Sequence, residues 1–386
     1  MKTFNLLLIV LFLSIEVRST QLSGTYSINP SISATTTNFQ DFSSAITFLT
    51  SSGTRSDGGP SNSSPFGVSG AVIFQVNAGT YLLNSAINIP AITGASTTNN
   101  ITFDGGNASS CFVRGVIDSS SIFILNQCFY ITLLNFSITN LDTGICAGVS
   151  ILGNSINTSG TGCSIKNCII NLPNTIYPDF SSCIYAASLL IRNNSNPVVN
   201  FNANNIEIDS NIFTGGYSSV YILGGSSSNY NFGLKIRNNI CKSAYGSSIN
   251  LRNIYNGINI FNNTISLSEY ALPSGSGISL STCINNSGTS HNISGNKITN
   301  VPSIGISLYQ CGGGSANPVK IYNNMICGGF SYSAVNYGIQ IYNSGVSYSE
   351  VYYNSVYMDF AAGTVYGLYH SGAGGSTVKN NINCRR

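Results

Sequence analysis

The sequence predicts an all-β solenoid of about ten coils, built from parallel strands and opened by a capping helix. One observation is a strand-like motif that recurs, as in "LKIRNNICKSA" (234–244) and "VKIYNNMICGG" (319–329). Another is a glycine-led motif between its copies, as in "GISLST" (277–282) and "GISLYQ" (305–310). Short β-branched strands separated by Gly and Asn turns, at a period of about 28 residues, are typical of a solenoid whose units stack on one another.

Aligning the copies of the first motif brings one asparagine of each copy into register. These asparagines are Asn211, Asn239, Asn263, Asn296, Asn324, Asn354 and Asn381. We expect them to form a column, because Asn tolerates the left-handed backbone of a sharp turn and because stacked amides can hydrogen-bond at a strand spacing of about 4.8 Å. Weaker copies, with Phe136 and Cys168 in the asparagine's place, extend the pattern upstream.

Apolar and polar residues alternate along the predicted strands. Ile206 and Ile208 in one copy, and Val319 and Ile321 in another, would point inward and stack on their counterparts in neighbouring coils. A β-sandwich is the alternative for a chain of short strands. A sandwich gives no reason for the same inward column to return at a near-constant period, so the pattern favours the solenoid.

The N-terminal residues predict a secreted protein with a capped solenoid. Residues 1–19 have the basic start, short apolar core and small residues of a signal peptide. Residues 20–60 would hold a strand and a capping helix, because apolar residues recur at helical spacing between 38 and 53. Residues 61–386 would form the parallel β-helix, in an extracellular protein. No later stretch approaches the roughly 18 apolar residues of a membrane span.

Composition limits the partners of the predicted protein. Only 7% of the residues are charged, and removing the signal peptide would leave 13 basic and 11 acidic residues. Nothing therefore predicts a nucleic-acid partner, and no motif predicts a metal site or a cofactor. Nine Asn-x-Ser/Thr sequons predict glycosylation, and 11 cysteines in a secreted chain predict disulfides.

Two cysteines hold the same place in successive copies of the glycine-led motif. Cys283 follows "GISLST" and Cys311 follows "GISLYQ". Residues in register on adjacent coils have Cα atoms about 5 Å apart, within disulfide range. We therefore expect a disulfide between them.

The N-terminal part also carries a family resemblance. The segments "NFQDFSSAITFLTSSG" (38–53), "GAVIFQVNAGTYLLNSAINIPAI" (70–92) and "NNITFDGGN" (99–107) resemble the capping helix and first strands of right-handed parallel β-helix proteins of the pectin lyase-like superfamily. The resemblance covers residues 22–386 and implies the fold. The superfamily contains lyases, hydrolases, esterases and adhesins. The signatures of its polygalacturonase-like and methylesterase-like members are missing here.

One cluster of charged residues could carry catalysis. Glu207 and Asp209 would face outward on one strand, about 7 Å apart, and Lys235 and Arg237 take the same two columns one coil later. Two carboxylates at that separation could perform inverting acid–base hydrolysis or help to hold a cation. The alternative is an exposed stack of ion pairs that fixes the register and has no other role.

Four tyrosines predict an aromatic surface on the outside of the solenoid. They fall in two columns on adjacent coils, Tyr322 with Tyr352 on one strand of the coil and Tyr309 with Tyr342 on the other. Rows of aromatic rings can stack on sugar rings, and amides such as Gln340 and Asn250 would hydrogen-bond the hydroxyls. The alternative is that tyrosine serves here only as a residue that favours and shields strands.

These observations leave three classes of function. The leading interpretation is a non-catalytic protein of the cell surface or matrix that holds polysaccharide. A polysaccharide lyase or glycoside hydrolase is the second interpretation, and a structural rod or adhesin is the third.

The C-terminal segment "STVKNNINCRR" (376–386) predicts an uncovered last coil. Its inward residues Val378 and Ile382 would be exposed, because the terminal strands of a solenoid have no neighbour on one side. We expect self-association through this coil, with Cys384 near the contact.

Overall fold

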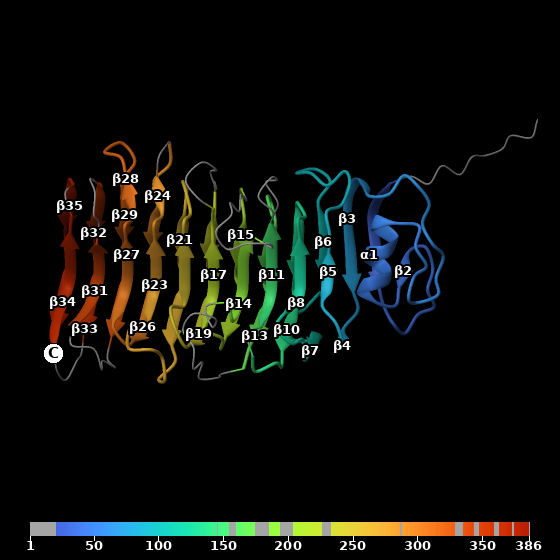
Figure 1. The fold of residues 1–386 in the computed structure, drawn as a ribbon, viewed down its shortest axis with the longest axis horizontal. Coiled ribbons are helices and arrows are strands. Elements are labelled where there is room, and N and C mark those ends of the chain that lie inside the picture. The colour runs from blue at the N-terminus through green and yellow to red at the C-terminus, as the bar shows by residue number, and fades with distance from the viewer. Residues whose placement is uncertain are drawn as a thin grey trace, which may run out of the picture.

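The computed structural model describes most of the chain between residues 21 and 385. The described ranges are 21–144, 146–153, 160–173, 185–193, 204–225, 233–285, 288–328, 335–342, 347–358, 363–372 and 374–385. The predicted signal peptide lies outside these ranges and stays a prediction. The described residues wind into a rod of stacked coils, with the N-terminal coils at one end and the C-terminal coils at the other (Figure 1).

Three long sheets form the wall of the rod. The first has 13 strands, in the spatial order β2 (Asn38–Phe39), β1 (Leu22–Ile28), β3 (Val68–Val76), β6 (Ile101–Asp104), β9 (Ile131–Leu134), β12 (Ser164–Lys166), β15 (Glu207–Asp209), β18 (Lys235–Arg237), β21 (Asn259–Phe261), β25 (Asn292–Ser294), β29 (Val319–Tyr322), β32 (Ser349–Tyr352) and β35 (Ser376–Lys379). The second has 11 strands, in the order β4 (Gly79–Leu83), β7 (Cys111–Gly115), β10 (Ser137–Asn140), β13 (Ile169–Asn171), β16 (Ile212–Thr214), β19 (Ile240–Ala244), β22 (Thr264–Leu267), β26 (Lys297–Val301), β30 (Met325–Gly328), β33 (Ser355–Met358) and β36 (Ile382–Arg385). The third has ten strands, in the order β5 (Ile87–Ile89), β8 (Ser121–Asn126), β11 (Ala147–Gly153), β14 (Ala187–Asn193), β17 (Ser218–Leu223), β20 (Ile249–Arg252), β23 (Ser276–Ser281), β27 (Ile304–Tyr309), β31 (Val335–Tyr342) and β34 (Thr364–Ser371). A short pair, β24 (Ile284–Asn285) and β28 (Gly312–Gly313), lies beside them.

Neighbouring strands in these sheets are parallel and come from successive coils. Ile236, for example, pairs with Ile208 on one side and Ile260 on the other, and all three are fully buried. Identical aliphatic side chains therefore stack along the interior, and their burial is the main stabilising contribution. Nine turns separate the ten strands of the third sheet. The predicted fold class, an all-β parallel β-helix with one N-terminal helix, is confirmed.

The asparagine column forms a hydrogen-bonded ladder along the rod. Oδ1 of Asn324 accepts from the backbone N–H and the Nδ2 of Asn296, at 3.0 and 2.9 Å. The N–H and Nδ2 of Asn324 donate in turn to Oδ1 of Asn354, at 3.0 and 2.9 Å. At the N-terminal end, the N–H of Cys168 donates to Oδ1 of Asn211 at 2.9 Å. Asn211 thus satisfies one donor of the preceding coil, and each later asparagine of the column satisfies two.

The left-handed backbone falls one residue earlier than the sequence predicted. The residues with positive φ directly before the column are Ser210, Asn238, Asn262, Gly295, Asn323, Tyr353 and Asn380. The prediction that the column asparagine itself takes this conformation is therefore wrong. The residue before it makes the bend, with φ +54° at Asn323, and the column side chain is then free to turn inward and hydrogen-bond.

The glycine of the second motif faces the packed interior. A Cβ atom added to Gly305 would lie 2.4 Å from Cγ2 of Ile326 and 2.5 Å from the carbonyl oxygen of Gly338. Gly277 has the same surroundings, with Cγ2 of Ile298 at 2.4 Å. Glycine therefore leads each motif because the ten-stranded sheet passes close to the isoleucines of the 11-stranded sheet.

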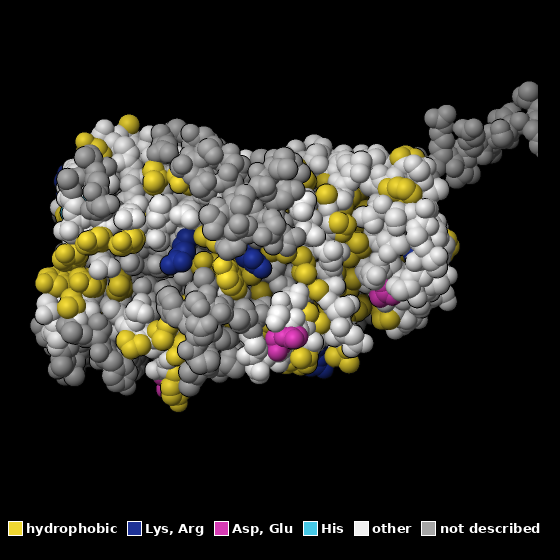
Figure 2. Space-filling view, viewed as in Figure 1, with side chains coloured by type: hydrophobic (Ala, Val, Ile, Leu, Met, Phe, Trp, Pro, Cys, Tyr) yellow, Lys and Arg dark blue, Asp and Glu magenta, His cyan; other side chains and the backbone are white. Residues whose placement is uncertain are grey.

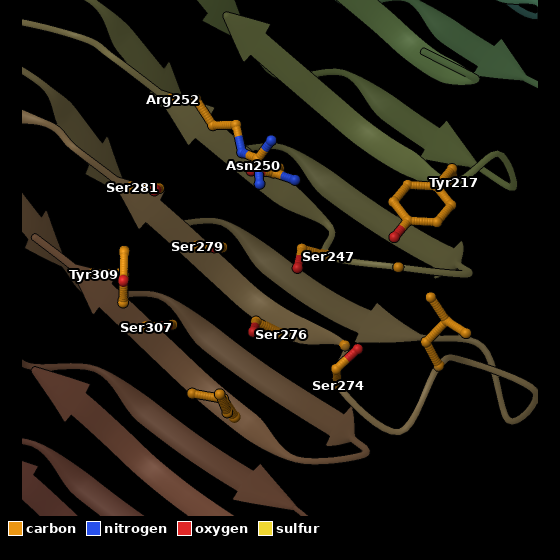
Figure 3. A pocket seen from close by; sticks show the side chains of 14 residues that line it. Tyr217, Ser247, Asn250, Arg252, Ser274, Ser276, Ser279, Ser281, Ser307 and Tyr309 are labelled. Atoms are coloured by element: carbon orange, nitrogen blue, oxygen red, sulfur yellow. The ribbon is translucent and has the colours of Figure 1, made fainter. Parts of the chain in front are cut away.

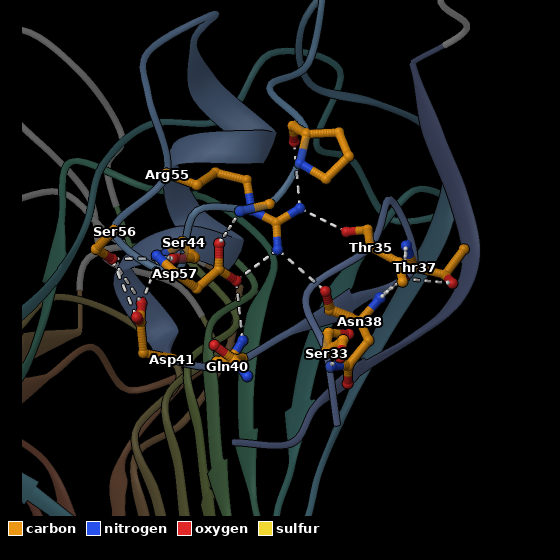
Figure 4. Close-up of polar contacts among 12 residues, drawn as sticks. Ser33, Thr35, Thr37, Asn38, Gln40, Asp41, Ser44, Arg55, Ser56 and Asp57 are labelled. Carbon is orange, nitrogen blue, oxygen red and sulfur yellow. Dashed lines mark hydrogen bonds and ion pairs between the residues drawn. The ribbon is translucent and has the colours of Figure 1, made fainter. Parts of the chain in front are cut away.

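The N-terminal cap is held by a buried arginine as well as by a helix. Helix α1 (Phe42–Thr50) is shorter than the predicted 38–53 segment and begins where Asp41 accepts the N–H of Ser44 at 2.6 Å. Arg55 pairs with Asp57 at 2.5 Å (Figure 4). Its guanidinium also lies over the ring of Phe39, 4.4 Å from the ring centroid. The cap thereby covers the aromatic end of the core.

The last coil is open on its outer side in the part of the chain that is described. Val378 is 50% exposed and Ile382 is 63% exposed. The segment 364–371 forms β34 and continues the ten-stranded sheet. Self-association through this coil stays a prediction. None of the described helices is long and apolar enough to cross a membrane.

His291 lies buried at the turn into β25. Its Nδ1 accepts a hydrogen bond from the N–H of Ile258 at 3.2 Å, and the side chain is 0% exposed. Burial lowers the pKa of His291 from 6.5 to about 4. The folded protein therefore keeps this imidazole neutral at pH values where the unfolded chain binds a proton.

We expect this histidine to make the fold sensitive to acid. Its contribution to the free energy of unfolding is complete above pH 6.5, and about 3 kcal/mol is lost as the pH falls towards the folded pKa of about 4. His291→Asn keeps an acceptor for the Ile258 N–H but cannot take up the proton. Chemical denaturation of parent and variant across this interval should show their stabilities converging at low pH. A constant difference would contradict the assignment.

Candidate functional site

Two outward columns of polar and aromatic side chains run along the ten-stranded sheet. Register pairs place one column as Asn250, Ser279, Ser307, Gln340 and Tyr369. The other column is Arg252, Ser281, Tyr309, Tyr342 and Ser371. These side chains point away from the core because residues alternate between the two faces of a strand. The sheet thus presents amides and hydroxyls next to an aromatic row.

A groove of about 350 Å³ lies over β20, β23 and β27 on this face. The base of the groove is formed by short side chains, among them Ser279, Ser281 and Ser307. Figure 3 shows Ser281 between Arg252 and Tyr309, with Ser279 and Ser307 in the neighbouring column. The described lining residues therefore supply short hydroxyls, one amide and one guanidinium, which are hydrogen-bonding groups.

Tyr309 continues the groove into an aromatic platform. Its ring stacks on that of Tyr342 with the centroids 5.5 Å apart and the planes 3° from parallel. Tyr309 is 47% exposed and Tyr342 is 42% exposed. Figure 2 shows hydrophobic side chains, which there include tyrosine, gathered over the C-terminal coils of this view.

A second aromatic cluster extends the platform by one coil. The rings of Tyr337 and Tyr366 stack at 5.5 Å and 11°, and Tyr369 packs against both at 5.2 and 5.4 Å. Burial, and after it the neighbouring Tyr369 and Tyr366, raise the pKa of Tyr337, so this phenol stays protonated. Sequence analysis missed this cluster. The signal that could have revealed it is the alignment of the glycine-led motif copies, in which Tyr369 aligns with Gln340.

The four predicted tyrosines form two pairs, and the pairs lie on different sheets. Tyr322 and Tyr352 stack at 5.3 Å and 12° on the 13-stranded sheet. Burial, and after it Glu350 and the neighbouring tyrosines, raise the pKa of Tyr352. The two amides weighed with them, Asn250 and Gln340, lie on the ten-stranded sheet. Only the Tyr309 pair therefore adjoins the groove and the amides.

The candidate catalytic carboxylates belong to a row of ion pairs on the 13-stranded sheet. Glu207 is opposite Lys235 and Asp209 is opposite Arg237, as the sequence predicted. The predicted pair of Asp209 with Arg237 is formed, at 2.9 Å. Glu207 has other partners than Lys235: Arg237 lies 2.6 Å from it, and Lys166 of the preceding coil lies 2.5 Å from it.

The electrostatics of this row favour a structural role. Partial burial would raise the pKa of Glu207, but the charges of Lys166 and Arg237 outweigh it and hold the pKa below its usual value. A general acid must instead keep its proton near neutral pH. Glu207 does not have that property. Among the described residues, no group of three or more His, Cys, Asp or Glu is suited to a metal ion.

The predicted disulfide is not formed in the structure. Cys283 and Cys311 are buried free thiols, and their Sγ atoms lie 3.5 and 3.4 Å from the carbonyl oxygens of Ser281 and Tyr309. Because Ile284 is in register with Gly312, the two cysteines stack directly on adjacent coils. A disulfide between them stays a prediction.

Comparison with known proteins supports the fold. No protein-family model matches the sequence, and the search of curated proteins returned no match. The crystal structure of the GH136 lacto-N-biosidase from Eubacterium ramulus matches with a TM-score of 0.53 at 10% identity, covering 82% of this chain and 62% of the biosidase. The enzymatically active domain of bacteriophage CBA120 tailspike protein 2 matches with a TM-score of 0.47 at 13% identity, covering 78% of this chain and 42% of the tailspike domain. Pectate lyase Pel9A matches with a TM-score of 0.45 at 12% identity, covering 79% of this chain and 71% of the lyase.

The chain spans less than two thirds of the biosidase's length, and identities this low bear on the fold alone. The parallel strand pairing, the three sheets and the N-terminal helix agree with that similarity. The chain thus shares the parallel β-helix fold of the biosidase, which is the fold that its resemblance to the pectin lyase-like superfamily implied.

Proposed function

We propose that this protein is secreted and binds a linear polysaccharide along the outer face of the ten-stranded sheet, at the cell surface or in the matrix. The observation that carries the proposal is the serine-floored groove that continues into the stacked rings of Tyr309 and Tyr342. It combines a flat apolar surface with convergent hydrogen-bonding groups, which is the combination that sugar rings require.

The geometry suits a chain that lies along the rod. Coils repeat at a spacing of about 4.8 Å, so hydroxyls and rings recur in a straight row from β20 to β34. The hydroxyl of Ser307 donates a hydrogen bond to Oε1 of Gln340 at 3.3 Å. This bond fixes the orientation of the Gln340 amide, and with it the direction of the amide nitrogen. A ligand that crosses several coils would therefore meet similar groups at regular intervals.

The chemistry of the groove favours binding over hydrolysis. Hydrolysis of a glycosidic bond ordinarily uses two carboxylates placed on either side of it. The described lining of the groove consists of Ser, Asn, Arg, Tyr, Gly, Leu and Ile, and Glu207 and Asp209 lie on another sheet. A lyase or glycosidase is the alternative function, and a rod or adhesin without a glycan ligand is the third.

We expect Tyr309→Ala to weaken polysaccharide binding by about 10- to 30-fold, because it removes the ring that borders the groove and unstacks Tyr342. The measurement is titration of the full chain against a panel of soluble polysaccharides. Tyr322→Ala is the matched control, since it removes one ring of an equally spaced stack on another sheet. Equal losses in the two variants would contradict the groove as the binding site.

The same panel separates the three functions. After incubation with each polysaccharide, the absence of unsaturated and reducing-end products together with Tyr309-dependent binding supports the proposal. Product release would favour the enzyme. Neither products nor binding would favour the rod.

A further inference from the structure

We propose that Cys128 and Cys163 form a disulfide when the chain folds in the presence of a disulfide oxidant. Their Sγ atoms lie 3.9 Å apart, and both side chains are 0% exposed. They are 35 residues apart in the sequence. All ten cysteines in the described part of the chain are free in this structure, so this pair is the reduced form of the proposed bridge.

The backbone brings these two cysteines together from different positions in their coils. Cys128 lies in the turn between β8 and β9, whereas Cys163 directly precedes β12. Because Ser164 pairs with Thr132, Cys163 is in register with Ile131 and not with Cys128.

The turn that leads to Cys163 is hydrogen-bonded to the turn of the preceding coil, which contains Cys128. The N–H of Gly160 donates to the carbonyl of Cys128 at 2.7 Å, and the N–H of Cys163 donates to the carbonyl of Gly160 at 3.1 Å. These bonds hold the two turns in contact, so rotation of the side chains can bring the sulfurs within bonding distance.

This arrangement differs from that of the sequence-predicted pair. Cys283 and Cys311 are in register, so their Cβ atoms are held at the strand spacing. The out-of-register approach of Cys128 to Cys163 has no such constraint, and their side chains can converge as a disulfide requires. The observation that carries Cys128–Cys163 as a bridge between coils is the 3.9 Å approach of their Sγ atoms.

The proposed reaction is thiol–disulfide exchange with a small-molecule disulfide such as oxidised glutathione. One thiolate attacks the oxidant and releases a thiol, and the second then displaces the remaining oxidant sulfur. The two cysteines lose two protons and two electrons, and one oxidant disulfide becomes two thiols. Burial raises the pKa of Cys128 well above its usual value, so exchange takes place during folding, before the coil closes.

The bridge would link the turn before β9 to the residue before β12 and close a loop that contains β9, β10 and β11. A crosslink of this kind stabilises the protein mainly by restricting the unfolded chain. It would also require an oxidising folding compartment, which is the compartment that the predicted signal peptide implies.

The test is to refold the full chain with oxidised glutathione, alkylate free thiols under denaturing conditions without reductant, and map the peptides. We expect one linked species containing Cys128 and Cys163, lighter by two hydrogens than the reduced pair, and a lower thermal midpoint after reduction. Cys128→Ser should remove the linked species, and the control Cys283→Ser should retain it.

Alkylation of both Cys128 and Cys163 after oxidative refolding would overturn the proposal. A link from either cysteine to a different partner would overturn it as well. Mapping of the parent chain decides between these outcomes even if Cys128→Ser does not fold.

Discussion

Asn324→Ala is expected to lower the free energy of unfolding by about 3 to 5 kcal/mol, because buried groups that lose their partners cost about 1 to 3 kcal/mol each. The N–H and Nδ2 of Asn296 would both lose their shared acceptor. The carbonyl of Ile293 would lose the Nδ2 donor that lies 2.9 Å away. Chemical denaturation followed by circular dichroism measures the loss.

The neighbouring Asn323 provides the control for this prediction. It is exposed and has the positive φ, so Asn323→Gly should change the stability by about 0.5 kcal/mol or less, since glycine adopts this conformation freely. If Asn324→Ala cost no more than Asn323→Gly, the ladder would not contribute to stability. If Asn323→Gly were the more harmful change, the separation of bend and ladder between the two residues would be wrong.

Arg55→Met is expected to lower the free energy of unfolding by about 3 to 5 kcal/mol, because it leaves a buried carboxylate without its partner. Asp57 and Arg55 both have side chains that are 0% exposed. The guanidinium also donates to the carbonyls of Thr35, Asn38 and Pro60, at 2.5, 3.0 and 3.2 Å (Figure 4). Thermal and chemical denaturation of the variant measure the effect.

A second substitution distinguishes the unpaired charge from the lost packing. Arg55→Met combined with Asp57→Asn removes both charges, and it should regain part of the stability lost in the single variant. The amide oxygen introduced at this position can still accept the N–H of Gln40, which lies 3.0 Å from the present carboxylate of Asp57. Identical stabilities for the single and double variants would show that the ion pair is not what holds the cap.

The sequence predicted the groove only in part. It placed Tyr309 beside Tyr342 and singled out Asn250 and Gln340, because a register between motif copies can be read from an alignment. It also placed the Tyr309 pair and the Tyr322 pair on different strands of the coil, but it did not show which pair adjoins the amides. Nor did it show the groove, whose depth depends on serines in three strands and on the larger side chains at their ends.

The sequence predicted the register of the charged residues and one of their two ion pairs, that of Asp209 with Arg237, but not the partners of Glu207. Opposite positions on adjacent coils follow from the repeat, and Glu207 does lie opposite Lys235. The long side chain of Arg237 instead reaches diagonally to Glu207, and Lys166 approaches from the other side. Long flexible side chains choose their partners by three-dimensional distance, which the repeat does not specify.

The sequence by itself determined the path of the chain: parallel coils, a stacked aliphatic interior and a column of asparagines from Asn211 to Asn381. A repeated pattern of side chains fixes these features, because each coil meets a near copy of itself. The tertiary structure decided which residue of the turn bends, how Arg55 closes the cap and which cysteines meet. These depend on the exact route of irregular turns, where Asn323 takes the bend and Cys128 approaches Cys163 out of register. Such contacts join residues that no repeat relates, so only the folded chain brings them together.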